Sequence, residues 1–163
     1  MFGYSRRKKK GLEMRRYLKT VNGQEYGFGD DGSPIECFRC GICCVVYQAK
    51  VTIEEIEYMA EQLSVTTDEF IAGYVTVTQI GYLLRQTENG CVFLAREKGS
   101  SKVSCDIYSF RPAPCRNWVP GLSRPECQEG LLKLQRDNKI LSVSEIYETQ
   151  AQVERFCALL RQP

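Results

Sequence analysis

Two adjoining segments of the chain carry apolar residues at helical spacing. The first segment has an apolar stripe at Ile53, Ile56, Tyr58, Met59 and Leu63. Thr52 with Glu55, and Thr66 with Glu69, each match a capping box, in which two side chains satisfy free backbone amides at the start of a helix. The pattern therefore predicts two short helices in succession between residues 52 and 74.

The next segment alternates between apolar and polar positions and is rich in β-branched residues, which predicts a strand over residues 76–86. Asn89-Gly90 is a signal for a tight turn, and the apolar run 91–95 after it is the expected partner strand. After a polar loop, residues 103–108 predict a third short strand.

Prolines and capping residues shape the expectations for the C-terminal part. The prolines on either side of Ala113 predict an extended, stiff approach to Cys115. A helix is expected over residues 126–136, and Ser142 with Glu145 is expected to cap a last helix. The apolar face of that last helix comprises Ile146, Val153, Phe156 and Leu160. Together the elements predict a small single α+β domain with short helices and a small antiparallel sheet.

The basic residues of the 163-residue chain are concentrated at its N-terminus. Residues 1–20 contain eight Lys or Arg and one acid, so the rest of the chain is net acidic. We expect a flexible basic arm over residues 1–30 and a cysteine-cluster metal-binding domain over residues 31–163. Residues 21–34 predict turns or a short hairpin. Such an arm could bind RNA, DNA or anionic lipid, and the alternative is a solvated tail. The acidic remainder of the chain does not resemble a nucleic-acid-binding face.

The composition excludes several classes of protein. The chain has no histidine, so Ser-His-Asp triads, Cys-His proteases, HExxH zinc sites, Cys2His2 fingers and His-ligated haem are all ruled out. No apolar run approaches the ~18 residues of a membrane span, and no apolar stretch follows the first basic residues as in a secretory signal. A cytoplasmic and non-enzymatic protein is therefore expected.

Nine cysteines are the most unusual feature, and four of them fall within residues 37–44 (CFRCGICC). Thiols this close in sequence make small, strained disulfide loops, so metal ligation in a reducing compartment is the preferred interpretation. The C-x2-C-x2-C run of Cys37, Cys40 and Cys43 matches three corners of a cubane iron–sulfur cluster. Because a zinc knuckle also uses C-x2-C, both zinc and an iron–sulfur cluster remain open.

Cys44 directly follows Cys43, and adjacent side chains of an extended backbone point to opposite sides. Cys44 is therefore expected to serve a second centre, to bridge two metals, or to pack as a small apolar residue. Eight thiols are available for two four-thiolate sites. One assignment places Cys37, Cys40, Cys43 and Cys115 on one centre and Cys44, Cys91, Cys105 and Cys127 on the other. Cys157 lies on the apolar stripe of the last helix and is expected to be a core residue.

The runs CFRCGICC, GCVFL, CDIY and RPAPCR occur in this order over about residues 35–118. In this combination the chain closely resembles the YkgJ-type cysteine-cluster proteins, which are described as zinc- or iron-chelating CxxCxxCC proteins. The resemblance implies metal chelation by thiolates and no settled reaction. It places Cys37, Cys40, Cys43, Cys44, Cys91, Cys105 and Cys115 on the cysteines of the family. Cys127 falls outside the core motif.

Four more side chains are expected around the metal site. Arg111 and Arg116 flank Cys115, where their guanidinium groups would offset thiolate charge or receive an anionic ligand; a surface salt bridge is the alternative. Tyr108 and Trp118 are expected to shield the site from solvent, although plain core packing explains them equally well.

The sequence thus predicts a protein that binds zinc or an iron–sulfur cluster, with a structural, electron-transfer or assembly role. Its expected partners are the metal ion or cluster and another protein, with no membrane span. One alternative is a nucleic-acid-binding zinc module that uses the basic N-terminal arm. Another is a thiol oxidoreductase that uses Cys37/Cys40 or Cys43/Cys44, but a redox C-x-x-C normally opens a helix after a strand.

Overall fold

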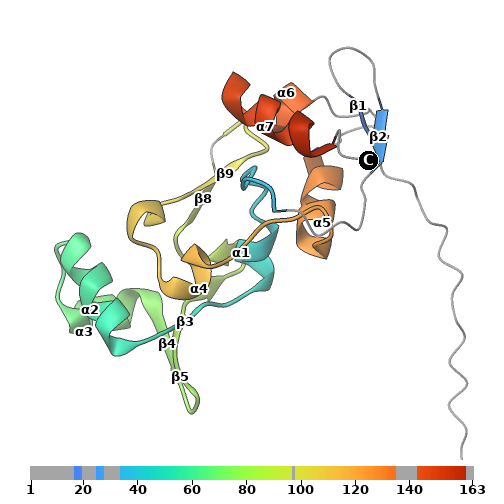
Figure 1. The fold of residues 1–163 in the computed structure, drawn as a ribbon. Helices are drawn as coiled ribbons and strands as arrows, with labels where there is room; N and C mark the ends of the chain where they lie inside the picture. The colour runs from blue at the N-terminus through green and yellow to red at the C-terminus, as the bar shows by residue number, and fades with distance from the viewer. Residues whose placement is uncertain (1–16, 20–24, 28–33, 97, 135–142, 161–163) are drawn as a thin grey trace, which may run out of the picture.

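The computed structural model describes residues 17–19, 25–27, 34–96, 98–134 and 143–160. Short helices and short antiparallel strands succeed one another along the chain, which confirms the predicted α+β class (Figure 1). In these residues the strands form four separate small sheets instead of the single sheet expected.

Two short strands are described in the N-terminal part of the chain. β1 (Tyr17–Lys19) and β2 (Glu25–Gly27) pair antiparallel, with Leu18 opposite Tyr26. The other residues of the expected basic arm lie outside the described residues. The division into an arm and a metal-binding domain therefore stays a prediction.

Both capping boxes are confirmed, and each begins a helix where predicted. α2 (Ile53–Gln62) starts after Thr52, whose hydroxyl accepts from the backbone N–H of Glu55 while the Glu55 carboxylate accepts from the N–H of Thr52. Thr66 and Glu69 repeat the arrangement before α3 (Thr67–Tyr74). Each box satisfies amides that a helix start leaves unpaired. The two helices pack against each other.

The alternating segment 76–86 forms a hairpin, so the single strand predicted there is wrong. β4 (Val75–Thr78) and β5 (Gly81–Leu84) pair around a tight turn, and β3 (Lys50–Val51) pairs with the other edge of β5. The Thr78 hydroxyl closes the turn, because it donates to the Gly81 carbonyl at 2.8 Å and accepts from the Ile80 N–H at 3.2 Å. A period-two pattern looks the same in one strand and in two.

A tight turn is confirmed one residue before the predicted Asn89-Gly90 pair: Glu88 and Asn89 join β6 (Gln86–Thr87) to β7 (Gly90–Cys91), and Gly90 begins β7. The expected partner strand 91–95 is divided between this hairpin and the next one. β8 (Leu94–Arg96) pairs with β9 (Val103–Cys105), and the 3-10 helix η1 (Tyr108–Phe110) ends the segment predicted as a third strand.

The approach to Cys115 is extended at Arg111 and Pro112 but becomes helical at Ala113, so the predicted extended segment is shorter than expected. Pro112 is the N-cap of the one-turn helix α4 (Ala113–Arg116), which contains Cys115. Proline is compatible with the first turn because its missing N–H has no intrahelical partner there. The helix predicted over residues 126–136 is confirmed as α5 (Pro125–Leu134).

The predicted last helix is divided into α6 (Val143–Ile146) and α7 (Gln150–Leu160). Thr149 explains the break, because its hydroxyl accepts from the N–H of Gln152 at 3.3 Å and its own N–H donates to the Gln152 side chain at 3.2 Å. This is another capping box, and it starts α7 anew. Ser142, the predicted cap, lies outside the described residues.

In the part of the chain that the structure describes, buried side chains form two apolar clusters. The first core comprises Ile35, Phe38, Cys40, Ile42, Leu122, Cys127, Leu131, Val143, Ile146, Tyr147 and Phe156. The second core comprises Val51, Ile56, Met59, Ala60, Phe70, Val75, Leu84, Phe93 and Ile107. Figure 1 shows α2 and α3 at one end and α5, α6 and α7 at the other, with α1 (Ile42–Val46) and α4 between them. None of the helices in the described ranges combines the length and apolar character needed to cross a membrane.

Candidate metal centre

A cavity of about 570 Å³ is lined by residues of both cores and by most of the cysteines. The cysteines that line it are Cys37, Cys40, Cys43, Cys44, Cys91, Cys105, Cys115 and Cys127. These are the eight thiols predicted from the sequence as metal ligands. All nine cysteines lie in described residues, and none of them forms a disulfide.

Six segments of the chain bring these thiols together. Cys37 and Cys40 lie before α1, Cys43 and Cys44 on α1, Cys91 on β7, Cys105 on β9, Cys115 on α4 and Cys127 on α5. Cys37 is exposed, Cys40 and Cys127 are buried, and the others are half-buried. The cavity thus gathers sulfur from segments far apart in the sequence and remains open to solvent on the side of Cys37.

Four of the cysteines share one local geometry, in which the backbone N–H two residues further along the chain donates to the sulfur. The donors are Arg39 for Cys37, Ile42 for Cys40, Phe93 for Cys91 and Ile107 for Cys105. Such hydrogen bonds favour the thiolate, which is the form of cysteine that binds metals. In these four cysteines the hydrogen bonds partly offset burial, which raises the pKa of each thiol.

Cys43 and Cys44 lie on the helix α1 and not on the extended backbone assumed from the sequence. Successive helical side chains diverge by about 100°, so both can face the same cavity, and their Sγ atoms are 3.9 Å apart. Their interaction lowers the pKa of the Cys43 thiol and raises that of Cys44. Cys43 is therefore the first of the pair to ionise.

Burial makes the other thiols reluctant to ionise without a cation. It raises the pKa of the Cys40 and Cys115 thiols to about 11. Neighbouring sulfurs add to both shifts by charge repulsion, Cys37 in the case of Cys40 and Cys91 in the case of Cys115. A positive ion in the cavity would remove this penalty, so protons would be released as metal binds.

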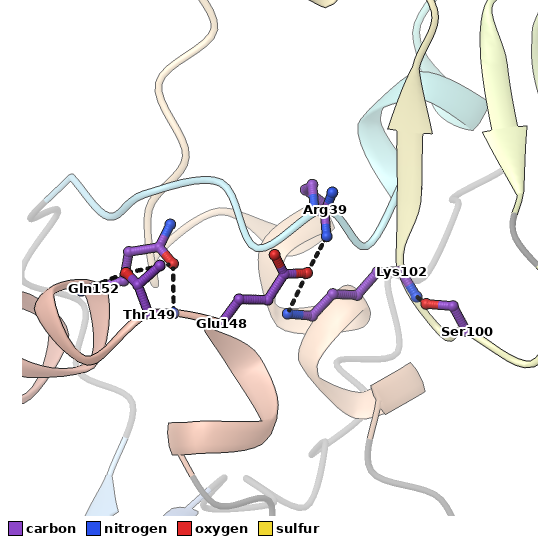
Figure 2. A network of polar contacts seen from close by, with 6 residues as sticks. All are labelled: Arg39, Ser100, Lys102, Glu148, Thr149 and Gln152. Atoms are coloured by element: carbon purple, nitrogen blue, oxygen red, sulfur yellow. Dashed lines mark hydrogen bonds and ion pairs between the residues drawn. The ribbon is translucent and has the colours of Figure 1, made fainter.

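Arg39 anchors the loop that carries Cys37 and Cys40. Its guanidinium forms an ion pair with Glu148 at the junction of α6 and α7, and Lys102 lies 3.6 Å from the same carboxylate (Figure 2). The Arg39 carbonyl accepts from the N–H of Val103 in β9 at 2.9 Å. Ion pairs this exposed contribute little energy, but together these contacts join the loop to β9 and to the C-terminal helices.

The two arginines predicted beside the site differ in position. Arg111 lines the cavity, its guanidinium lies 3.8 Å from the centroid of the Tyr108 ring, and its buried Nε has no hydrogen-bond partner among the described residues. Arg116 is exposed, and its Nη1 donates to the Arg111 carbonyl at 2.7 Å. Arg111 is therefore the arginine placed to interact with thiolates.

Tyr108 and Trp118 line the cavity, as their predicted shielding role requires, but neither is enclosed. Tyr108 is 56% exposed. The Trp118 ring lies 5.1 Å from the Tyr47 ring and 4.4 Å from the Arg124 guanidinium, measured from its centroid. The aromatic side chains therefore border the cavity instead of covering it.

The sequence pattern did not point to Glu126 or Tyr47, which also line the cavity. The Tyr47 hydroxyl donates to the Glu126 carboxylate at 2.5 Å, and this hydrogen bond lowers the pKa of Glu126. Glu126 could have been assigned to the site from the sequence, because it directly precedes Cys127 on a predicted helix. Cys157 instead packs against the first core, as expected for the ninth cysteine.

No three Cys, Asp or Glu side chains in the described ranges are already arranged to hold one metal ion. Zn–S bonds are about 2.3 Å long, so the sulfurs would have to draw together around a bound cation. The donor set nevertheless fits such a cation, because it consists of unpaired thiols with backbone N–H donors aimed at several of them.

A family model described as "Putative zinc- or iron-chelating domain" matches residues 36–140, which is more than half of the chain and includes all eight thiols of the cavity. The chain belongs to the CxxCxxCC family. The resemblance expected from the cysteine motifs is thus confirmed. The matched range, residues 36–140, also includes Cys127, which lies outside the core motif.

A protein of Acinetobacter calcoaceticus named "Putative ferredoxin" is similar to this CxxCxxCC protein. The two are 32% identical over 84 residues, which is 52% of this chain and 63% of the relative. The chain therefore spans less than two thirds of the length of that relative. No solved structure matches the chain.

Proposed function

We propose that this protein binds a metal centre through the thiolates of the central cavity, and that the centre is structural or transfers electrons. The observation that carries the proposal is the gathering of eight cysteines around one cavity without a disulfide. Thiols that are held around one cavity without forming disulfides are explained by a cation that takes the place of their protons.

The residues assigned to the metal are the eight lining cysteines, with Arg111 as a neighbouring positive charge. The backbone N–H groups of Arg39, Ile42, Phe93 and Ile107 would donate to ligand sulfurs. Such donors hold the ligands in position and tune the potential of an iron–sulfur cluster. When bound, the group would supply either a rigid cross-link between loops or a one-electron redox centre.

Iron is the metal favoured by two observations. The C-x2-C-x2-C spacing of Cys37, Cys40 and Cys43 suits a cubane cluster, and the relative from Acinetobacter calcoaceticus carries the name of a ferredoxin. Zinc is the alternative, since the family description names both metals.

The direct test is anaerobic purification followed by elemental analysis, assay of acid-labile sulfide and a visible spectrum. We expect bound iron with a matching amount of sulfide and a brown colour, because iron–sulfur clusters absorb visible light. A colourless protein with stoichiometric zinc would support thiolate binding and correct the metal. Protein without zinc or iron above trace level would overturn the proposal.

Arg111 gives a separate prediction. Its positive charge favours the thiolate forms of Cys37, Cys105 and Cys115. The substitution Arg111→Gln should therefore weaken metal binding by about tenfold, as measured by competition with a chelator. Arg116→Gln is the matched control, and its affinity should stay that of the wild type. Equal effects of the two substitutions would argue against a role for Arg111 in balancing thiolate charge.

The thiol oxidoreductase alternative is less well supported by the geometry. A nucleophilic redox cysteine has a lowered pKa and opens a helix after a strand. Here burial raises the pKa of Cys40 to about 11, and Cys37 and Cys40 lie in a loop that follows no described strand directly. Cys43 does have a lowered pKa and lies in the first turn of α1, but α1 follows the same loop instead of a strand, and the pKa of its neighbour Cys44 is raised. The nucleic-acid-binding alternative depends on the basic N-terminal arm, most of which lies outside the described residues.

A further inference from the structure

Four of the eight thiols belong to or pack against the two cores, Cys40 and Cys127 with the first core and Cys91 and Cys105 with the second. We infer, building on the metal-thiolate function proposed above, that the cavity holds two separate four-thiolate centres. One centre comprises Cys37, Cys40, Cys43 and Cys127, and the other comprises Cys44, Cys91, Cys105 and Cys115. Compared with the assignment made from the sequence, Cys115 and Cys127 exchange places.

The first group is built on the first core. Cys40 and Cys127 are both buried members of that core, and helices α1 and α5 pack against each other. Gly130 lies one turn after Cys127 on α5, and a Cβ at Gly130 would lie only 2.3 Å from the Sγ of Cys40. The thiol of Cys127 also interacts electrostatically with Cys43 and Cys37. Packing and charge thus place Cys127 with Cys37, Cys40 and Cys43.

The second group is built on the second core, against which Cys91 and Cys105 pack. Strand β7 contacts α1, and a Cβ at Gly90 would lie 3.1 Å from the carbonyl oxygen of Cys44. Gln86, which is opposite Cys91 in the β6–β7 hairpin, donates from Nε2 to the same carbonyl at 3.4 Å. Cys44 is therefore the member of the adjacent pair that lies beside Cys91.

The position of α4 assigns Cys115 to the second group. The N–H of Ala113 donates to the Glu55 carboxylate at 2.6 Å, which joins α4 to α2, and α4 also contacts β3. Both α2 and β3 contribute to the second core. The Cys115 thiol interacts more strongly with Cys91 and Cys105 than with Cys43. The interactions of the Cys115 thiol, the hydrogen bond of the α4 backbone and the packing of α4 therefore all place Cys115 with the second group.

Pairs of substitutions distinguish the two assignments. Cys37 is exposed, so Cys37→Ser leaves both cores intact and serves as the starting variant. Bound metal per chain is measured by elemental analysis after anaerobic purification, and again after reconstitution of metal-free protein with cobalt(II). We expect Cys37→Ser to retain about half of the wild-type metal. Adding Cys127→Ser should leave that half unchanged because both residues serve one centre, whereas adding Cys115→Ser should remove it.

The matched control is Cys37→Ser with Cys157→Ser, which should equal Cys37→Ser alone, because Cys157 lies outside the cavity. Retention of half of the metal with Cys115→Ser, and its loss with Cys127→Ser, would restore the sequence-based assignment and overturn this one. Complete loss of metal in Cys37→Ser alone would indicate one shared centre and overturn the inference. Wild-type protein that binds no metal would instead refute the proposed function. Folding is checked by circular dichroism, and a reciprocal series built on Cys91→Ser replaces any member that fails to fold.

Discussion

Replacing Cys40 by serine is expected to remove metal and stability together. Cys40 is a buried member of the first core, and its sulfur is one of the proposed ligands. In thiolate sites of this kind the binding free energy is also folding free energy, of order 10 kcal/mol for a structural zinc. We therefore expect Cys40→Ser to lose the metal of its centre and to lower the free energy of unfolding by more than about 4 kcal/mol. Denaturant titration with elemental analysis measures both changes.

Cys157→Ser is the control for this experiment. Cys157 is half-buried against the same core but lies outside the cavity, so serine there should leave the metal content unchanged. The two variants separate the loss of a ligand from the loss of a small apolar contact. A Cys40→Ser protein with full metal occupancy and unchanged melting would remove Cys40 from the set of ligands.

Gly130→Ala is expected to destabilise the protein although alanine is the better helix former. A Cβ at Gly130 would lie 2.3 Å from the Sγ and 2.6 Å from the Cβ of Cys40, and 3.2 Å from the ring of Phe38. Overpacking of this kind costs about 1–3 kcal/mol, which exceeds the gain of about 1 kcal/mol in helix propensity. The displaced Cys40 should also bind metal less well. Thermal unfolding and metal content of the purified variant measure the two effects.

Gly73→Ala gives the matched comparison, because Gly73 also lies inside a helix. It is exposed on α3, and a Cβ there would have no neighbour within 4 Å. We expect this substitution to stabilise the protein by about 0.5–1 kcal/mol through helix propensity alone. If the two alanine variants shifted stability in the same direction by the same amount, the close approach of α5 to Cys40 would not be the cause.

Local signals of the sequence were sufficient for much of the fold and for the cysteines that line the cavity. The capping boxes at Thr52 and Thr66 identify helix starts because both hydrogen-bonding partners lie within four residues. The eight thiols could be chosen because four of them cluster within residues 37–44, and because the absence of histidine excludes the sites that depend on that residue. Their gathering around one cavity follows from the fold.

Other features depend on contacts that no local pattern records. Alternation of apolar and polar residues does not distinguish the β4–β5 hairpin from one long strand. The division of the last helix depends on the contact between Thr149 and Gln152. Cys115 and Cys127 are equally available along the sequence. Only the packing of α4 against α2 and β3, and of α5 against α1, distinguishes which neighbours each of them has.

Because the molecule has two separate cores, its rigidity depends on what joins them. Each end of the molecule has an apolar interior of its own, and the cysteines lie where the two ends meet. Without a cation the buried thiols stay largely protonated and form no bond across the cavity, whereas bound cations would join the two ends in one orientation. The stiffness of the whole molecule, and hence any surface assembled from both ends, would then depend on whether the cell has supplied the metal.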